Sequence, residues 1–196
     1  MSILNSLKSA LNKYSGELAN TAAAKVKSAI ASKTETITFD VLPTDLEAFK
    51  ALPQADLKSP FSTAALTVLA LSVWENDKET SKAMLNFLSG PEPISNYTCQ
   101  MIDMSMRGKG YKSRSYFEGS RPDNNYTPSK PYTLKISTNP YSFQDEGYCK
   151  LWLQSGGADS PREIRFRQKK STGQWFLVEQ YLLSDIRIPV AEDKWA

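Results

Sequence analysis

Basic and aromatic residues are interleaved in one segment of the second half of the chain, where Tyr111, Tyr116 and Phe117 lie among lysines and arginines. Such cations can neutralise phosphates while the rings stack on bases. A second basic run is spaced by two residues, so on a strand its side chains share one face. The candidate contacts to nucleic acid or another anion are Arg107, Lys109, Lys112, Arg114, Arg165, Arg167 and Lys169. The alternative interpretation is a solvated loop and a strand face whose charge prevents association.

The composition disfavours catalysis. None of the 196 residues is histidine, which removes the commonest general base and the commonest metal ligand. We find no catalytic motif, cofactor fingerprint or metal-ligand spacing, so we expect no catalytic residue, no cofactor and no metal. The enzymatic alternative is a histidine-free active site in a pocket between sheet and helices, working with carboxylates, Lys or Tyr.

The net charge of +3 is distributed unevenly along the chain. Residues 1–33 carry +4, residues 34–105 carry −6 and residues 106–196 carry +5. Such polarity favours docking between parts of a chain, or between copies, over a uniformly basic protein built for nucleic acid. We therefore expect a homo-oligomer or a protein partner, with nucleic acid as the alternative.

The N-terminal segment, residues 1–33, has the pattern of an amphipathic helical arm. Apolar residues recur at steps of three and four on one stripe. Three interpretations stay open: packing on the fold or on a second subunit, contact with a membrane surface, and a free arm. The residues expected to carry self-association are Leu4, Leu7, Leu11, Tyr14 and Leu18.

Residues 34–196 are expected to form one α+β domain that begins with a strand over 34–42, where Ile37, Phe39 and Val41 alternate with polar residues. Caps and helix breakers then delimit the helices. The last of these, Asn96 to Met106, also fits a strand because its methionines alternate. The helices are predicted at about 45–52, 60–74, 77–89 and 96–106.

The chain then becomes strand-rich. Residues 107–130 read as a loop with a short strand around Tyr111 to Phe117, because Gly, Ser, Pro and Asn are frequent there. Alternating runs follow, and the segment from Gly147 to Leu183 predicts a three-strand antiparallel meander. Its last run, Trp175 to Leu183, is apolar on both faces and is expected to be the central strand. The whole predicts an antiparallel sheet of four to five strands on a helical layer.

Several stretches of this meander resemble a known family. Ser155-Gly-Gly-Ala-Asp-Ser-Pro-Arg162, Gly173-Gln-Trp-Phe-Leu177 and Gln180-Tyr-Leu-Leu-Ser-Asp-Ile-Arg187 are similar to the C-terminal signature of a bacterial family of unknown function. The resemblance covers about residues 44–196 and implies a bacterial cytoplasmic protein, but it assigns no functional residue. A weaker similarity links the helices and curved sheet to the cone-shaped NTF2-like fold.

The remaining features also favour a cytoplasmic location. Two cysteines, Cys99 and Cys149, are too few for a disulfide framework and are expected to be reduced. We see no secretory signal and no apolar run of membrane-span length. The leading prediction is a non-catalytic binding or assembly module that self-associates through residues 1–33, with peripheral membrane contact of that segment as an alternative.

Overall fold

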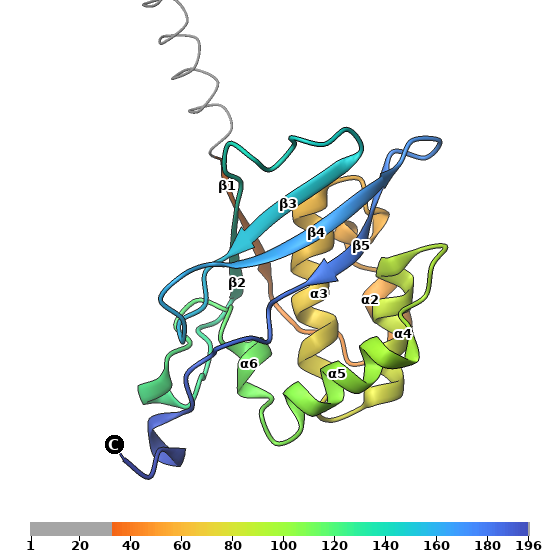
Figure 1. The fold of residues 1–196 in the computed structure, drawn as a ribbon. Coiled ribbons are helices and arrows are strands. Elements are labelled where there is room, and N and C mark those ends of the chain that lie inside the picture. The colour runs from red at the N-terminus through yellow and green to blue at the C-terminus, as the bar shows by residue number, and fades with distance from the viewer. Residues whose placement is uncertain (1–32, 196) are drawn as a thin grey trace, which may run out of the picture.

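The computed structural model describes residues 33–195 and contains one five-stranded antiparallel sheet with the order β1-β2-β3-β4-β5 (Figure 1). The fold is α+β with the predicted number of strands. The predicted N-terminal helix and its stripe from Leu4 to Leu18 lie outside the described residues. The strands are β1 (Thr34–Phe39), β2 (Tyr132–Ser137), β3 (Tyr148–Leu153), β4 (Arg162–Lys169) and β5 (Gln174–Gln180).

The helices lie between β1 and β2 in the sequence, and their starts follow from local capping. Asp45, Ser59, Asp77 and Ser95 each accept a hydrogen bond from a backbone N–H of the first helical turn. The segment from Asn96 is therefore a helix, one of the two predicted alternatives. The α-helices are α2 (Leu46–Lys50), α3 (Pro60–Val73), α4 (Lys78–Ser89), α5 (Asn96–Met106) and α6 (Tyr111–Arg114). Single 3₁₀ turns occur at Pro53–Asp56, Pro122–Asn124 and Val190–Glu192.

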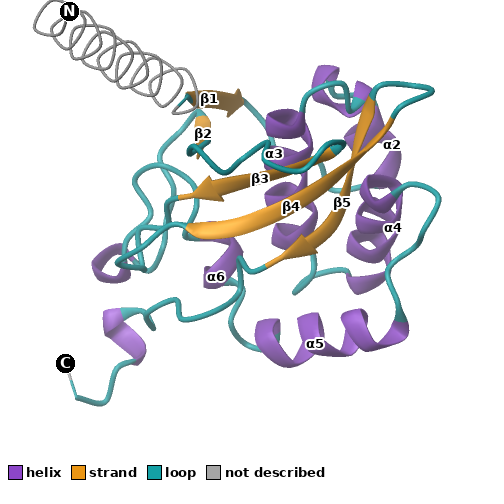
Figure 2. Ribbon diagram, turned by 45° about the horizontal axis from the view of Figure 1, so that its top comes forward, coloured by secondary structure: helices purple, strands orange, loops and turns teal. Residues whose placement is uncertain are grey.

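Helix α3 forms the centre of the core, as its nearly continuous apolar sequence predicts. Residues from Pro60 to Leu71 are buried apart from Ser62. In Figure 2 the strands β3, β4 and β5 cross in front of α3, so the helices lie behind one face of the sheet. We call this the inner face, and the opposite one the outer face. Among residues 33–195 no helix is long and apolar enough to cross a membrane.

The prediction of a short strand around Tyr111 to Phe117 is wrong, because most of that segment is helix α6 and the turn that follows it. Its aromatic residues are held by long-range contacts instead of a strand ladder. The ring of Tyr111 stacks on that of Tyr126 at 5.4 Å, and the Tyr116 hydroxyl donates to the carbonyl of Leu182. Only Phe117 forms an isolated bridge to the sheet.

The meander is confirmed, but the prediction that Trp175 lies in the central strand is wrong. Strand β5 is at the edge of the sheet and ends at Gln180. Leu177 is buried in the core, and Trp175 and Phe176 pack against it half-buried, with Phe176 also beside Gly90 in the loop after α4. The apolar residues on both faces of β5 thus reflect an edge strand that packs against the core on one side and lies beside a groove.

Candidate functional site

The start of β5 has backbone partners on both sides, and the following residues do not. Trp175 donates its N–H to the carbonyl of Leu57 at 2.8 Å, and its own carbonyl accepts from the Thr63 hydroxyl at 3.0 Å. These groups point away from β4, and those of Leu177, two residues on, point the same way. Within residues 33–195, nothing beyond the sheet pairs with the N–H or C=O of Leu177.

A β-bulge at Val178 continues this free edge. The register between β4 and β5 shifts there by one residue. Beyond it, Tyr181 donates its N–H to the carbonyl of Glu163 at 3.0 Å, so the backbone of the preceding Gln180 faces outward. The described part of the chain offers no partner to these outward groups of Gln180 either. Strand β5 therefore presents two sets of unpaired backbone groups on one edge.

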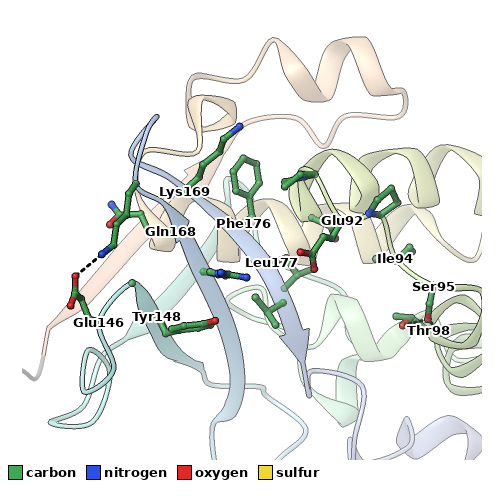
Figure 3. A pocket seen from close by; sticks show the side chains of 17 residues that line it. Glu92, Ile94, Ser95, Thr98, Glu146, Tyr148, Gln168, Lys169, Phe176 and Leu177 are labelled. Atoms are coloured by element: carbon green, nitrogen blue, oxygen red, sulfur yellow. Dashed lines mark hydrogen bonds and ion pairs between the residues drawn. The ribbon is translucent and has the colours of Figure 1, made fainter.

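A groove runs along this edge between β5 and the α4–α5 region (Figure 3). It consists of two cavities, of about 700 Å³ and about 220 Å³. Because they share lining residues, we treat them as one continuous feature and call it the edge groove. The shared residues are Ser89, Ile94, Thr98, Leu177 and Val178.

The wall opposite β5 is fixed by local hydrogen bonds. Gly90 has a φ of +66°, and a Cβ built on it would lie 2.4 Å from the ring of Phe176, so only glycine allows this approach. Further along, the backbone N–H of Ile94 donates to the Asn86 side chain at 3.0 Å. These contacts position the loop after α4 beside β5.

The larger cavity extends onto the outer face of the sheet. Tyr148, Arg167 and Phe176 are direct neighbours across β3, β4 and β5, and all three line it. The guanidinium of Arg167 lies over the ring of Tyr148, 5.7 Å from its centre. No carboxylate within residues 33–195 forms an ion pair with Arg167 or with Lys169. This end of the groove therefore holds two cations that form no ion pair with a described carboxylate.

The neighbouring cation Arg165, in contrast, is paired with two carboxylates. Its guanidinium donates to Glu163 at 2.5 Å and to Glu179 at 2.8 Å, and it lies over the ring of Tyr181. The hydrogen bond to Glu163 raises the pKa of Arg165 above its usual value. Arg165 and Arg167 share the outer face, as their spacing predicts, but only Arg167 is available to a ligand.

The structure does not bring the basic segment before β2 together with β4. Arg107 pairs with Asp103 at 2.7 Å, and Lys112 donates to the carbonyl of Leu183 at 2.9 Å. Burial lowers the pKa of Lys112, whereas Lys109 and Arg114 form no ion pair with any described carboxylate. Ser115, just after α6, bonds to the loop preceding β4, so this segment lies at the opposite end of β4 from Lys169.

The glycine-rich turn of the signature is a structural element. The N–H of Gly156 donates to the Ser115 carbonyl at 2.8 Å, and that of Gly157 donates to the Ser155 hydroxyl at 3.0 Å. A Cβ on Gly156 would lie 1.9 Å from the carbonyl oxygen of Ser120. The N–H groups of both glycines are therefore used within the fold and are not directed at an anion.

A further cavity of about 420 Å³ lies beside α4 and α5 around Asp103. Hydrogen bonds from Lys78 and Arg107 lower the pKa of Asp103 to about 2. This is a neutralised ion cluster and no candidate for acid–base chemistry. Across residues 33–195, no group of three or more Cys, Asp or Glu side chains could hold a metal ion.

Both cysteines are free thiols in the structure. Cys149 is buried in β3, and burial raises its pKa to about 12. Cys99 is half-buried on α5. A thiol that stays protonated at neutral pH is a poor nucleophile, so Cys149 is a core residue.

Sequence reasoning did not identify the edge groove. Its signals were present as the apolar outer residues of β5 and the Pro-containing segment after Gly90, yet no local pattern joins two segments so far apart. Comparison with known proteins gives the family. No curated protein and no solved structure matches the chain. The family model described as a domain of unknown function (DUF6935) matches residues 41–190. The chain belongs to this family.

Proposed function

We propose that this domain is a non-catalytic protein-interaction module that binds an extended segment of another protein along β5. The observation that carries the proposal is the free edge at Leu177 and Gln180, which opens into the edge groove. An added strand would pair with these backbone groups, as in other domains that bind peptides by strand addition. The absence of histidine also favours binding over catalysis.

The groove supplies side-chain contacts in addition to backbone pairing. Alternate side chains of an added strand point to opposite faces of the sheet. Side chains directed inward would contact the apolar lining residues Ile94 and Leu177, and those directed outward would contact Phe176. Main-chain hydrogen bonds would provide affinity, and the two rows of side chains would provide selectivity.

The test is a selection of displayed random dodecapeptides on the full chain, with two variants as comparison. Thr98→Trp places a large side chain where the two cavities meet. Tyr97→Trp is the matched control, since Tyr97 is exposed on the same helix and lines neither cavity. We expect enriched peptides to bind the wild type and Tyr97→Trp equally and to bind Thr98→Trp at least about tenfold more weakly.

Thermal unfolding of both variants verifies that they fold. If no peptide is enriched, or if the enriched peptides bind folded Thr98→Trp as well as the wild type, the proposal fails. Protection of the Leu177 amide from hydrogen exchange in the complex would separately identify β5 as the strand that pairs.

A second candidate function is binding of single-stranded nucleic acid to the outer face. The cation–aromatic pair of Arg167 with Tyr148 supports it, because such pairs can stack bases and neutralise phosphate. The ion pairs of Arg165 with Glu163 and Glu179 count against it. It predicts salt-dependent binding of oligo-dT that is lost in the Arg165→Glu, Arg167→Glu double variant; binding that is absent or independent of salt would exclude it.

Self-association through residues 1–33 stays a prediction. Light scattering should show an oligomer for the full chain and a smaller species when these residues are removed. If both proteins are monomers, this assembly role fails, while the edge groove would still be open to other proteins.

A further inference from the structure

The pattern of charge on the outer face specifies what an added strand should carry. We infer that the bound segment presents an acidic side chain, Asp or Glu, in the row of Arg167 and that this residue determines specificity. The inference rests on the proposed function, because it names the chemistry of the partner at the same groove. It depends on comparing two neighbouring rows of residues across β3, β4 and β5.

The guanidinium of Arg165 is neutralised within the domain. Across the three strands its row contains Lys150, Arg165 and Glu179. The carboxylate is supplied by β5 and accepts from Arg165 at 2.8 Å. Arg165 is thus paired with Glu179 on the next strand and with Glu163 on its own strand.

The row of Arg167 lacks the equivalent carboxylate. It contains Tyr148, Arg167 and Phe176, so an aromatic ring stands where Glu179 stands in the row of Arg165. The row ends at Phe176, next to the free edge that begins at Leu177, where a further strand would add residues. An acidic residue there would complete this row as Glu179 completes its neighbour.

The distance suits two side chains that extend toward each other. An added strand would lie two strand spacings from β4, about 10 Å. Arg167 reaches out from β4 over the outer face, and a Glu or Asp would reach back over Phe176. A guanidinium already stacked on a ring keeps its donor edges free for a carboxylate, so its position over Tyr148 does not prevent this pairing.

The other charges around this cavity are consistent with an acidic ligand. Lys169 has no ion pair with a described carboxylate, and Lys170 is paired with Glu146 at 2.6 Å. Glu92 on the opposite wall is the remaining carboxylate among the lining residues, and Figure 3 shows it across the cavity from Tyr148. Arg167 and Lys169 together outweigh Glu92, which leaves this end of the groove positively charged.

The experiment uses the dodecapeptides enriched on the wild-type chain. We expect an Asp or Glu at one fixed register position, and we expect its replacement by Gln to weaken binding about tenfold. Arg167→Gln should weaken the acidic peptide about tenfold and leave the Gln peptide unchanged. Lys150→Gln is the matched control, because Lys150 is a cation of the outer face in the neighbouring row; it should change neither affinity.

The outcomes separate this inference from the function on which it rests. Enriched peptides without a preferred acidic position, or an Arg167→Gln variant that weakens both peptides equally, would overturn the inference. Peptide binding would still be lost in Thr98→Trp, so the proposed function would stand. If no peptide is enriched and Arg167→Gln instead abolishes binding of oligo-dT, both are overturned in favour of nucleic acid.

Discussion

The two ends of strand β4 differ in how completely their polar groups are paired. At the start of the strand, Arg162 donates to the carbonyls of Ser184 and Asp185, and the preceding turn is closed by hydrogen bonds to Ser115. Near its other end, Arg167 forms no ion pair with a carboxylate among the described residues. The free edge of β5, at Leu177 and Gln180, runs beside the part of β4 between Phe166 and Ile164. The first end has the composition of a motif, and its polar groups form hydrogen bonds within the fold. The second has a plain composition, yet it is open to a ligand.

The largest expected effect is a loss of stability at the start of β4, which we call the paired end. Gly156→Val should lower the free energy of unfolding by about 3 kcal/mol, because the new side chain meets the Ser120 carbonyl and neither backbone can move freely. Urea unfolding gives the value. Thr98→Trp in the edge groove is the comparison and should change it by less than about 1 kcal/mol. Similar losses in both variants would remove the contrast between the two regions.

Two of the three arginines of β4 sharpen the comparison within one strand. Arg162→Gln should cost about 1 to 2 kcal/mol, because two backbone carbonyls lose a charged donor. Arg167→Gln should stay within about 0.5 kcal/mol, since that side chain has no ion pair with a described residue. The measurement is again urea unfolding. An Arg167→Gln variant as unstable as Arg162→Gln would show that Arg167 is structural.

Amide hydrogen exchange compares the two halves of β5 directly. The Trp175 N–H is bonded to Leu57, whereas that of Leu177 faces the groove. We expect the Leu177 amide to exchange at least about tenfold faster than the Trp175 amide in the free protein. Equal protection would mean that the edge already has a partner in the full chain.

The smallest effect concerns pH at the paired end. Burial raises the pKa of Tyr126 from its usual value near 10 to about 12, and its hydroxyl donates to the Arg187 carbonyl at 2.7 Å. The protonated form is thus favoured by folding, so its contribution is complete below pH 10 and is lost as the pH rises toward 12. Unfolding measured across this range should depend less on pH in Tyr126→Phe than in the wild type. Equal slopes would contradict this role.

Local patterns predicted much of the fold. Ser59 and Pro60 mark the start of α3, and the alternation from Gly147 onward predicts the meander of β3, β4 and β5. Such signals depend on neighbours in sequence, because a cap or an alternating face is complete within a few residues. The placement of β5 could not be obtained this way. Its outer residue Phe176 is covered by Gly90, more than eighty positions away.

The same limit applies to the candidate site. The spacing of Arg165 and Arg167 placed both on one face, and only Arg165 has a carboxylate two residues before it, Glu163, with which it pairs. Its second partner, Glu179, lies on the next strand, so no local pattern reveals it. Sequence alone also grouped the Arg107–Arg114 segment with β4, whereas the structure places it at the far end of that strand.

The sequence by itself determined the α+β class, the helix starts, the closing meander and the lack of histidine chemistry, because these depend on composition and on contacts between near neighbours. The tertiary structure decided which strand is the edge, which cation keeps its charge free and where the groove lies. These properties arise from strand register and long-range packing. A polar group on a strand is paired only if a neighbouring strand or a loop distant in sequence brings it a hydrogen-bond partner.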